Sequence, residues 1–246
     1  YAALNINTTG TSNVAVGTNA LAAQTTGGYN VAVGYGAGDA MTTAEYSVAV
    51  GRNALGVATT GGANTAVGDS ALAADTTGHS NTALGYGSLI ANTTAVGNTA
   101  VGRDALLANT TGHSSVAVGW ASLDANTTGS NNTAVGTSSL GATTTGDLNV
   151  AVGTNALQTN TVGDRSTAVG YGALTSQNPS SNADMNNVAV GLNAGASVTT
   201  GTGNTLLGAE AGDSVNTGVR HTIIGYNSGV NLTGGNDCIA IGETTN

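Results

Sequence analysis

Few side chains in this chain have the types and spacing needed for catalysis or metal binding. Its 246 residues include thirteen acidic residues, three histidines and one cysteine. The carboxylates, among them Asp69, Asp104, Asp124 and Asp164, are scattered, and none stands as an acid–base pair. The single Cys238 excludes an internal disulfide or a multi-cysteine metal site. We therefore expect no catalytic residue, no metal and no cofactor, and a protein that is not an enzyme.

Composition argues against several classes of partner. The net charge is -9, and only four residues are basic. Because nucleic-acid affinity depends mainly on Lys and Arg neutralising phosphates, nucleic acid is not an expected partner. No apolar run approaches the ~20 residues that span a bilayer. The run Gly34-Tyr35-Gly36-Ala37-Gly38 is no phosphate loop, since no helix fits between it and the next motif.

A tandem repeat organises the whole sequence. Aligning the chain on its Ala-Val-Gly tripeptides gives a step of 17 residues, with one longer step of 21. A fixed period of this length is typical of solenoids. The sequence thus predicts a single repeat domain, 1–246, of about fourteen coils. Because it starts within a repeat, we expect a fragment of a longer chain. The aligned glycines are Gly17, Gly34, Gly51, Gly68, Gly85, Gly102, Gly119, Gly136, Gly153, Gly170, Gly191, Gly208, Gly225 and Gly242.

The repeat reads roughly Asn-(Thr/Val)-Ala-Val-Gly-x-x-Ala-Leu-x-Ala-x-Thr-Thr-Gly-x-x. It is too short for a helical hairpin and has poor helix propensity, so we expect two short strands in each repeat. In the first strand, the second and fourth positions (Val14 and Val16) share one face. In the second strand, leucines such as Leu21 recur. We predict that these faces meet inside an all-β, parallel β-solenoid with one 17-residue coil per repeat.

Small residues occupy two further positions. The third position is Ala in most repeats (Ala15, Ala32), and the eighth is Ala or Ser. We expect these residues to face outward and to meet other copies of the chain, which predicts a homotrimer. The alternative is that tight packing within the coil itself requires small side chains. The first position is mostly Asn, which predicts a side-chain ladder along one turn.

The small residue at the third position is replaced in two late repeats. Leu206 and Ile223 stand there, and in the same repeats the usual leucine has become Gly212 and Gly229. This exchange indicates volume compensation in a shared core. Gly38 and Gly195 occupy the leucine register without any enlargement at the third position.

The repeat also places the histidines. His79 and His113 share one register two repeats apart, which at about 4.8 Å per coil separates them by about 10 Å. This distance is too long for direct sharing of one metal ion. We predict that all three histidines, His221 included, are solvated turn residues.

Candidate contact residues follow the motif glycine. This position is the most variable and most aromatic of the repeat, and exposed aromatic and Arg side chains are favoured at contact sites. The alternative is that the rings only cover the glycine turn or a neighbouring chain. An insertion within 176–186 contains Pro179, a further candidate, and is expected to bulge from one turn, as a contact or as a tolerated loop. The aromatic candidates are Tyr35, Tyr86, Trp120, Tyr171 and Tyr226.

These motifs carry a resemblance to known families. Asn-Thr-Ala-Val-Gly and Asn-Val-Ala-Val-Gly resemble the Asn-Ser-(Val)-Ala-Ile-Gly motif in head domains of YadA-like trimeric adhesins. The form with Ala-Leu-x-Ala-Asn-Thr-Thr-Gly is similar to phage tail-fibre repeats. Both resemblances cover almost the whole chain. They imply a trimeric, left-handed parallel β-roll with one coil per repeat. The period is longer here than in the adhesin heads, so one turn must be larger.

The expected function is that of a structural fibre or adhesin segment. We expect it in an extracellular surface appendage or a phage tail fibre, at the cell surface or on the virion, where it mediates attachment. Its expected partners are copies of itself and a host-cell surface glycan or protein. One alternative is an ice-binding β-solenoid, indicated by Thr-Thr pairs such as Thr25-Thr26. Another is a glycan-cleaving, tailspike-like protein.

Overall fold

The computed structural model describes residues 2–243 and is a parallel β-solenoid with 17-residue coils, as the repeat predicts. Within these residues there is no helix, and each coil contributes one strand of three residues to a long parallel sheet. The chain divides into two compact parts, one ending at Ala121 and the other starting at Ser122. Each part is described by itself.

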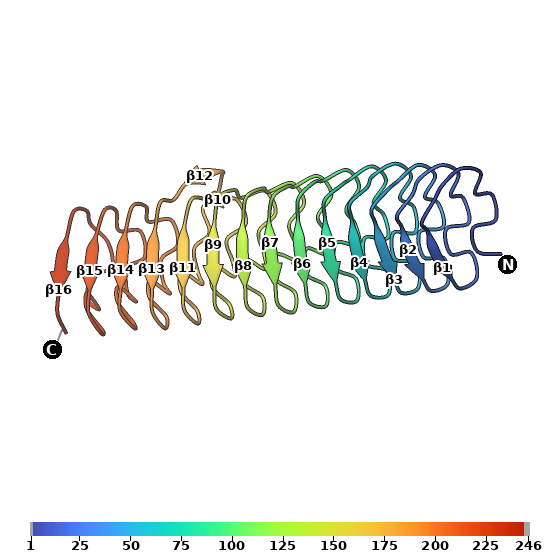
Figure 1. Cartoon of the computed structure of the whole chain (residues 1–246). Coiled ribbons are helices and arrows are strands. Elements are labelled where there is room, and N and C mark those ends of the chain that lie inside the picture. Colours follow the sequence, from blue (N-terminus) through green and yellow to red (C-terminus); the bar gives the residue numbers. More distant parts are fainter. Residues whose placement is uncertain (1, 244–246) are drawn as a thin grey trace. The chain divides into compact units, whose positions relative to one another are not determined.

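In the N-terminal part, each strand pairs with the next one in sequence, in parallel and in register (Figure 1). Ala15 lies opposite Ala32, and Ala32 lies opposite Ala49. The strands are β1 (Val14–Val16), β2 (Val31–Val33), β3 (Val48–Val50), β4 (Thr65–Val67), β5 (Thr82–Leu84), β6 (Thr99–Val101) and β7 (Val116–Val118).

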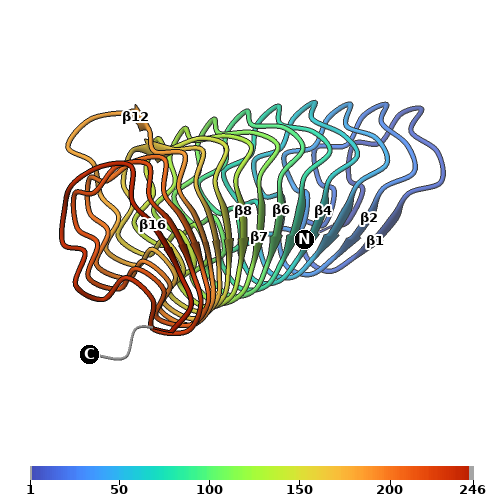
Figure 2. The ribbon, with the colours of Figure 1, turned by 90° about the vertical axis from the view of Figure 1, so that its left-hand side faces the viewer.

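The C-terminal part repeats this arrangement and adds a second, two-stranded parallel sheet, β10–β12. Successive coils of each part share nearly the same outline (Figure 2). The strands of the main sheet are β8 (Thr133–Val135), β9 (Val150–Val152), β11 (Thr167–Val169), β13 (Val188–Val190), β14 (Thr205–Leu207), β15 (Thr222–Ile224) and β16 (Ile239–Ile241). The added strands are β10 (Gly163–Asp164) and β12 (Ala183–Asp184).

The motif glycines line up from coil to coil because their backbones touch. A Cβ placed on Gly34 would lie 2.6 Å from the carbonyl oxygen of Gly51, and one on Gly17 would lie equally close to that of Gly34. The φ angles of these glycines lie well inside the positive region, at +138° for Gly34. Both features require glycine. The column therefore explains why this position does not vary.

The predicted inward face of the strands is wrong. The third-position alanines, such as Ala32 and Ala66, are completely buried, and so are the small residues at the eighth position, such as Ala54. The second and fourth positions instead point outward, and Val16 is 57% exposed. In coils where the leucine fills the interior, only a small side chain fits opposite it from the sheet, so alanine faces inward. Small residues thus serve packing within the coil, which was the alternative reading.

The second predicted strand is also absent from the described coils, because the leucine stands in a turn. Leu21 and Leu55 are fully buried and have φ near +50°, in the left-handed region that favours glycine. The same backbone recurs at Leu106 and Leu157. A left-handed residue costs about 1–2 kcal/mol, and burial of a leucine returns about 1.5–3 kcal/mol. The leucine column is therefore retained despite its backbone strain.

Glycine replaces this leucine wherever another side chain fills its space. Gly38 has φ of +59°, and a Cβ there would lie 2.7 Å from the Sδ of Met41 in the same coil. Leu206 of the following coil fills the space beside Gly195. The compensation predicted at Leu206 and Ile223 is thus real, lies within one chain, and extends to Gly38 and Gly195. Three residues after the glycine stand Met41, Val198, Val215 and Leu232, whereas leucine coils mostly carry a polar residue there.

A ladder of asparagines joins the coils at the first position. Asn81 Oδ1 accepts a 3.0 Å hydrogen bond from the backbone N–H of Asn98, and Asn81 Nδ2 donates to the carbonyl of Ala95 at 2.8 Å. Asn98 repeats the second bond with Gly112. The ladder is therefore present, but it runs from side chain to backbone. It pairs buried polar groups that would otherwise be unsatisfied.

Candidate functional site

In each part, the residues after the motif glycines form an outer column just beyond the C-terminal ends of the strands. All five predicted aromatic side chains are exposed, from 55% for Tyr86 and Tyr171 to 58% for Tyr35. Backbone hydrogen bonds tie the column together, as from Asn53 N–H to Tyr35 O at 2.9 Å. The predicted exposure of the aromatics is confirmed, while their role in contacts stays a prediction.

In the N-terminal part, this column alternates aromatic and charged groups. Arg52 forms an ion pair with Asp69 of the next coil at 2.9 Å. The Arg103 guanidinium carbon lies 5.6 Å from the centre of the Tyr86 ring, within cation–π range. Hydrogen bonds from Ser70 and then Arg52 lower the pKa of the Asp69 carboxyl. The column therefore offers flat apolar rings separated by fixed charges.

Every arginine of the chain is ion-paired with an aspartate. Besides Arg52, Arg103 pairs with Asp104 at 2.9 Å, and Arg165 pairs with Asp184 at 3.0 Å. Arg220 and Asp237 form a two-pronged pair through Nε and Nη2. This pairing raises the pKa of Arg220 and lowers that of Asp237. The four cations are neutralised locally, which disfavours a strongly anionic ligand.

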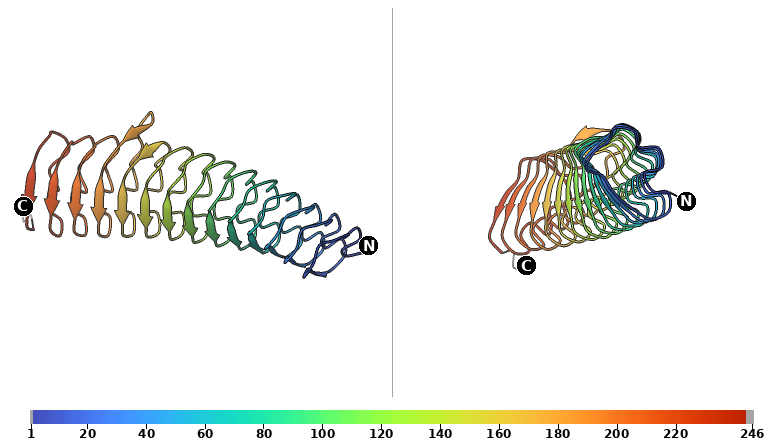
Figure 3. Two further views of the ribbon diagram at one scale, coloured as in Figure 1. Left: turned by 45° about the horizontal axis from the view of Figure 1, so that its top comes forward. Right: turned by 45° about the vertical axis from the view of Figure 1, so that its right-hand side comes forward.

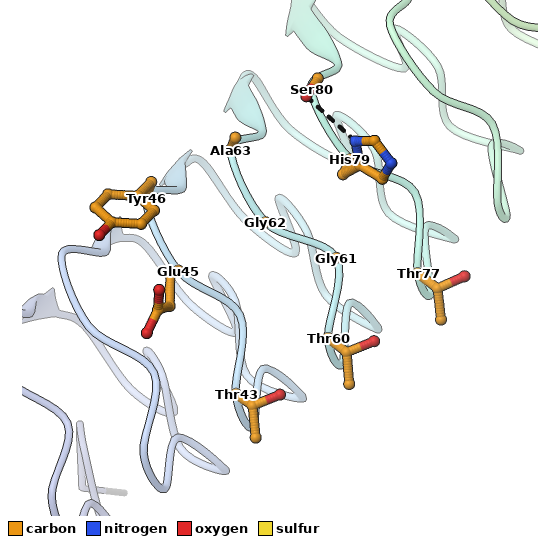
Figure 4. Close-up of a pocket in the computed structure, with 10 residues that line it drawn as sticks. All are labelled: Thr43, Glu45, Tyr46, Thr60, Gly61, Gly62, Ala63, Thr77, His79 and Ser80. Carbon is orange, nitrogen blue, oxygen red and sulfur yellow. Dashed lines mark hydrogen bonds between the residues drawn. The ribbon is translucent and has the colours of Figure 1, made fainter.

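A second surface feature lies over the turns that follow the Thr-Thr pairs. A notch of about 430 Å³ opens where Gly61, Gly62 and Ala63 leave one coil with small side chains. Figure 4 shows Glu45 and Tyr46 on one side of this coil and His79 on the other. The remaining lining residues are Thr43, Thr60, Thr77 and Ser80. The notch was missed by sequence reasoning, although Gly-Gly-Ala between bulkier turns was a visible signal.

The side chains around the notch are held by neighbours. Tyr46 stacks on Tyr29 of the preceding coil, with ring centres 5.2 Å apart and planes 7° apart. His79 Nδ1 lies 3.2 Å from Ser80 Oγ (Figure 4). The three threonines come from equivalent positions of successive coils, and all are exposed. The notch therefore combines an aromatic wall with a row of hydroxyls.

The insertion is ordered by pairing and burial. Its strand β12 pairs with β10, and the loop that carries β12 projects beyond the neighbouring coils (Figure 3). Met185 is buried. Pro179 is also buried, and its Cγ packs against Gly163. Exposure at Pro179 was therefore a wrong expectation, because the insertion folds back over the coil and leaves 180–182 as its exposed tip.

The histidines differ in environment. His79 and His113 are exposed turn residues, as predicted. His221 is 1% exposed, so its predicted solvation is wrong. It occupies the asparagine position of its coil, and its Nδ1 accepts a 3.1 Å hydrogen bond from the backbone N–H of Cys238. This register, visible in the sequence, marks His221 as a ladder residue.

Among residues 2–243, no three His, Cys, Asp or Glu side chains are grouped so as to hold a metal ion. The same residues include no helix with the length and apolar character needed to cross a membrane. No known family model matches the chain, and neither a curated protein nor a solved structure shows significant similarity to it.

Proposed function

We propose that this chain is a structural segment of an extracellular fibre or adhesin, assembled as a homotrimer and mediating attachment. The observation that carries the proposal is the outer face of the main sheet. Its outward side chains come from the second and fourth positions of the repeat, which are the first and third residues of each strand. They are all Val, Thr, Leu or Ile, and none is charged. Leu84 is 45% and Leu207 46% exposed. Parallel sheets are rarely left uncovered, and exposed apolar patches of this kind mark interfaces.

Copies of the same chain are the partner that fits this face. Its side chains recur with the 17-residue period, so another chain matches it over many coils only if it repeats at the same interval. The absence of charge on the face removes like-charge repulsion, although each chain has a net charge of -9. The small inward residues no longer support the trimer, and this outward face takes their place as its support.

Attachment is assigned to the outer aromatic column. The column lies beside the outer face of the sheet. When copies of the chain pack together through that face, the column stays exposed at the side of the assembly. Rings spaced along a regular scaffold present repeated contacts, and several weak contacts on linked copies add up to firm binding. This column supports the surface-binding part of the proposal, with a host-cell glycan or protein as the partner.

The molar mass of the purified chain in solution tests the proposal. Light scattering after size exclusion should give three times the 23.5 kDa of one chain. Leu84→Asp together with Leu207→Asp should yield monomers, because each places charge on the apolar face. Thr94→Asp, on an exposed turn, is the matched control and should leave the trimer intact. A wild-type monomer at micromolar concentration would contradict the assembly.

The two alternative functions have less support. The hydroxyl of the first threonine in each pair donates a hydrogen bond to a backbone carbonyl of the next coil, as Thr25 Oγ1 does to Thr42 O at 3.0 Å. This leaves a single exposed row, headed by Thr26, as an ice-binding surface. For glycan cleavage, Glu45 is the one carboxylate among the described residues that line the notch. Glycoside hydrolysis ordinarily uses two carboxylates.

A further inference from the structure

The notch beside Tyr46 is an open depression in the surface with an aromatic wall and a polar wall. Its volume of about 430 Å³ suits a small ligand that stays partly exposed, rather than one enclosed as in a typical ligand pocket. It exists because Gly62 and Ala63 interrupt a column in which the neighbouring coils carry Glu45, Tyr46 and His79. A ligand that enters it would lie between the tyrosine and the imidazole, above the threonines (Figure 4).

The aromatic wall suits the apolar face of a sugar ring. Tyr46 is 63% exposed, and its stacking on Tyr29 holds its ring in place without burying it. Because the ring is already held in place and partly exposed to solvent, it loses little conformational entropy when a ligand stacks on it. A pyranose presents a patch of C–H groups on one face, which packs against such a ring.

The polar wall suits the hydroxyl groups at the edge of the same sugar. The Glu45 carboxylate accepts hydrogen bonds from hydroxyls, while Thr43, Thr60 and Thr77 both donate and accept. The imidazole of His79 adds a further donor or acceptor. Sugar hydroxyls need this mixture of partners, and no backbone rearrangement is required to supply it.

The charges around the notch select a neutral sugar. Apart from His79, Glu45 is the only acidic or basic residue of the lining, and its charge is negative. The four arginines are all committed to aspartates. A carboxylate or sulfate on the sugar would therefore meet repulsion without a compensating cation.

We propose that the notch lined by Glu45, Tyr46 and His79 binds a neutral sugar unit of a glycan. The inference rests on the proposed attachment function and adds to it a second contact site, with a ligand class of its own. The site is distinct from the aromatic column after the motif glycines, which lies elsewhere on the coil. It is built from three consecutive coils, so its geometry depends on their stacking.

Two substitutions test the site without disturbing the backbone. Ala63 has φ of 56°, and Tyr46 and Tyr29 at the same register have 57° and 61°, so alanine and tyrosine are interchangeable there. Ala63→Tyr extends the stacked pair into the notch and fills it. Tyr46→Ala removes the platform. Leu148→Ala removes an exposed apolar side chain at the same register in the C-terminal part, outside the outer aromatic column, and is the matched control.

The experiment is saturation-transfer NMR on the full chain with methyl glycosides of glucose, galactose, mannose and N-acetylglucosamine, and with N-acetylneuraminic acid as the charged probe. At least one neutral glycoside should bind. Tyr46→Ala should weaken this binding about tenfold, Ala63→Tyr should abolish it, and Leu148→Ala should leave it unchanged. The acid should give no signal at pH 7.5.

Three results would overturn the proposal. They are no neutral glycoside binding, binding that survives both notch substitutions, and preferential binding of N-acetylneuraminic acid. The molar mass measured on the same samples separates this test from that of assembly. A trimer that binds no sugar refutes the notch alone, whereas a monomer that binds sugar through the notch supports it and refutes the assembly.

Discussion

Asp75 Oδ1 accepts a 2.8 Å hydrogen bond from the side-chain amide of Asn92, which stands at the same position of the next coil. Asp75 is fully buried. Burial raises the pKa of this carboxyl from 3.8 to about 6, against the opposing effect of hydrogen bonds from Asn92 and the Gly78 backbone. An ionisable group thus occupies a column that otherwise holds uncharged residues, among them amides such as Asn109.

This carboxyl makes stability depend on pH. Because the pKa of Asp75 is higher in the folded chain than in the unfolded chain, folding is favoured by protonation. The contribution is full below pH 3.8 and is lost as pH rises to about 6, a difference of about 3 kcal/mol. Asp75→Asn should raise the urea midpoint at pH 7.5 and remove this dependence. Asp69→Asn is the comparison: the pKa of that carboxyl is lowered in the folded chain, so its effect on the pH profile should have the opposite sign. An unchanged pH profile in Asp75→Asn would contradict the assignment.

The glycine and methionine at 38 and 41 should behave as one packing pair. Gly38→Leu alone places a side chain against the Met41 sulfur and should destabilise by about 1–3 kcal/mol. Gly38→Leu combined with Met41→Asn recreates the coil found around Leu89 and Asn92 and should recover most of the loss. Denaturation of the two single variants and the double variant measures the coupling. Additive losses would show that the two positions do not share space.

Substitutions in the asparagine ladder should lower stability by an amount that depends on how many hydrogen bonds the new side chain can still make. Asn81→Ala leaves the N–H of Asn98 unpaired, at a cost of about 1–3 kcal/mol for this buried group. It also removes the shorter of two hydrogen bonds to the carbonyl of Ala95, which keeps the one from Asn92. Asn81→Ser should cost less, because the Ser47 hydroxyl accepts a bond from the N–H of Asn64 at the equivalent place. Hydrogen exchange of the Asn98 amide gives a local readout. Equal protection in both variants would argue against the ladder.

The outer aromatic column should matter for attachment and not for folding. Replacing Tyr35, Tyr86 and Trp120 together by alanine removes three exposed rings and should reduce binding of the labelled chain to its target cells at least about tenfold. The midpoint of thermal unfolding should be unchanged. Leu192→Ala, in the same register of the C-terminal part, is the control. Full binding by the triple variant would remove the column from the proposed function.

The repeat predicts how the chain winds into coils, but not which side chains of each strand point into the coil. The period alone indicates one coil per repeat and parallel stacking, both confirmed by pairs such as Ala15 with Ala32. The alternation of Val14, Ala15 and Val16 shows that two faces differ without showing which is inside. Hydrophobicity favours valine inside, whereas a coil whose interior already holds the leucine has room only for alanine. The interior width depends on the turn that carries Leu21, and this turn has no short-range signature.

The left-handed leucines had a weaker signal in the sequence. Glycine at the same register, as at Gly38 and Gly195, indicates a backbone with positive φ. Leucine rarely adopts this backbone conformation, so the leucine found in most repeats gives no sign of it, whereas the glycine found in a few repeats does. The exposed aromatics were predictable because they vary at a fixed position. The notch was not, since it arises from three adjacent coils together and from the small side chains of one of them.

The two ways of filling the leucine space differ in how far they reach along the chain. Met41 fills the space beside Gly38 and belongs to the same repeat, so this repeat contains both residues of the packing pair. Gly195 relies on Leu206, which belongs to the following repeat. Recombination between tandem copies can therefore transfer the first kind singly, whereas the second must be inherited as a linked pair.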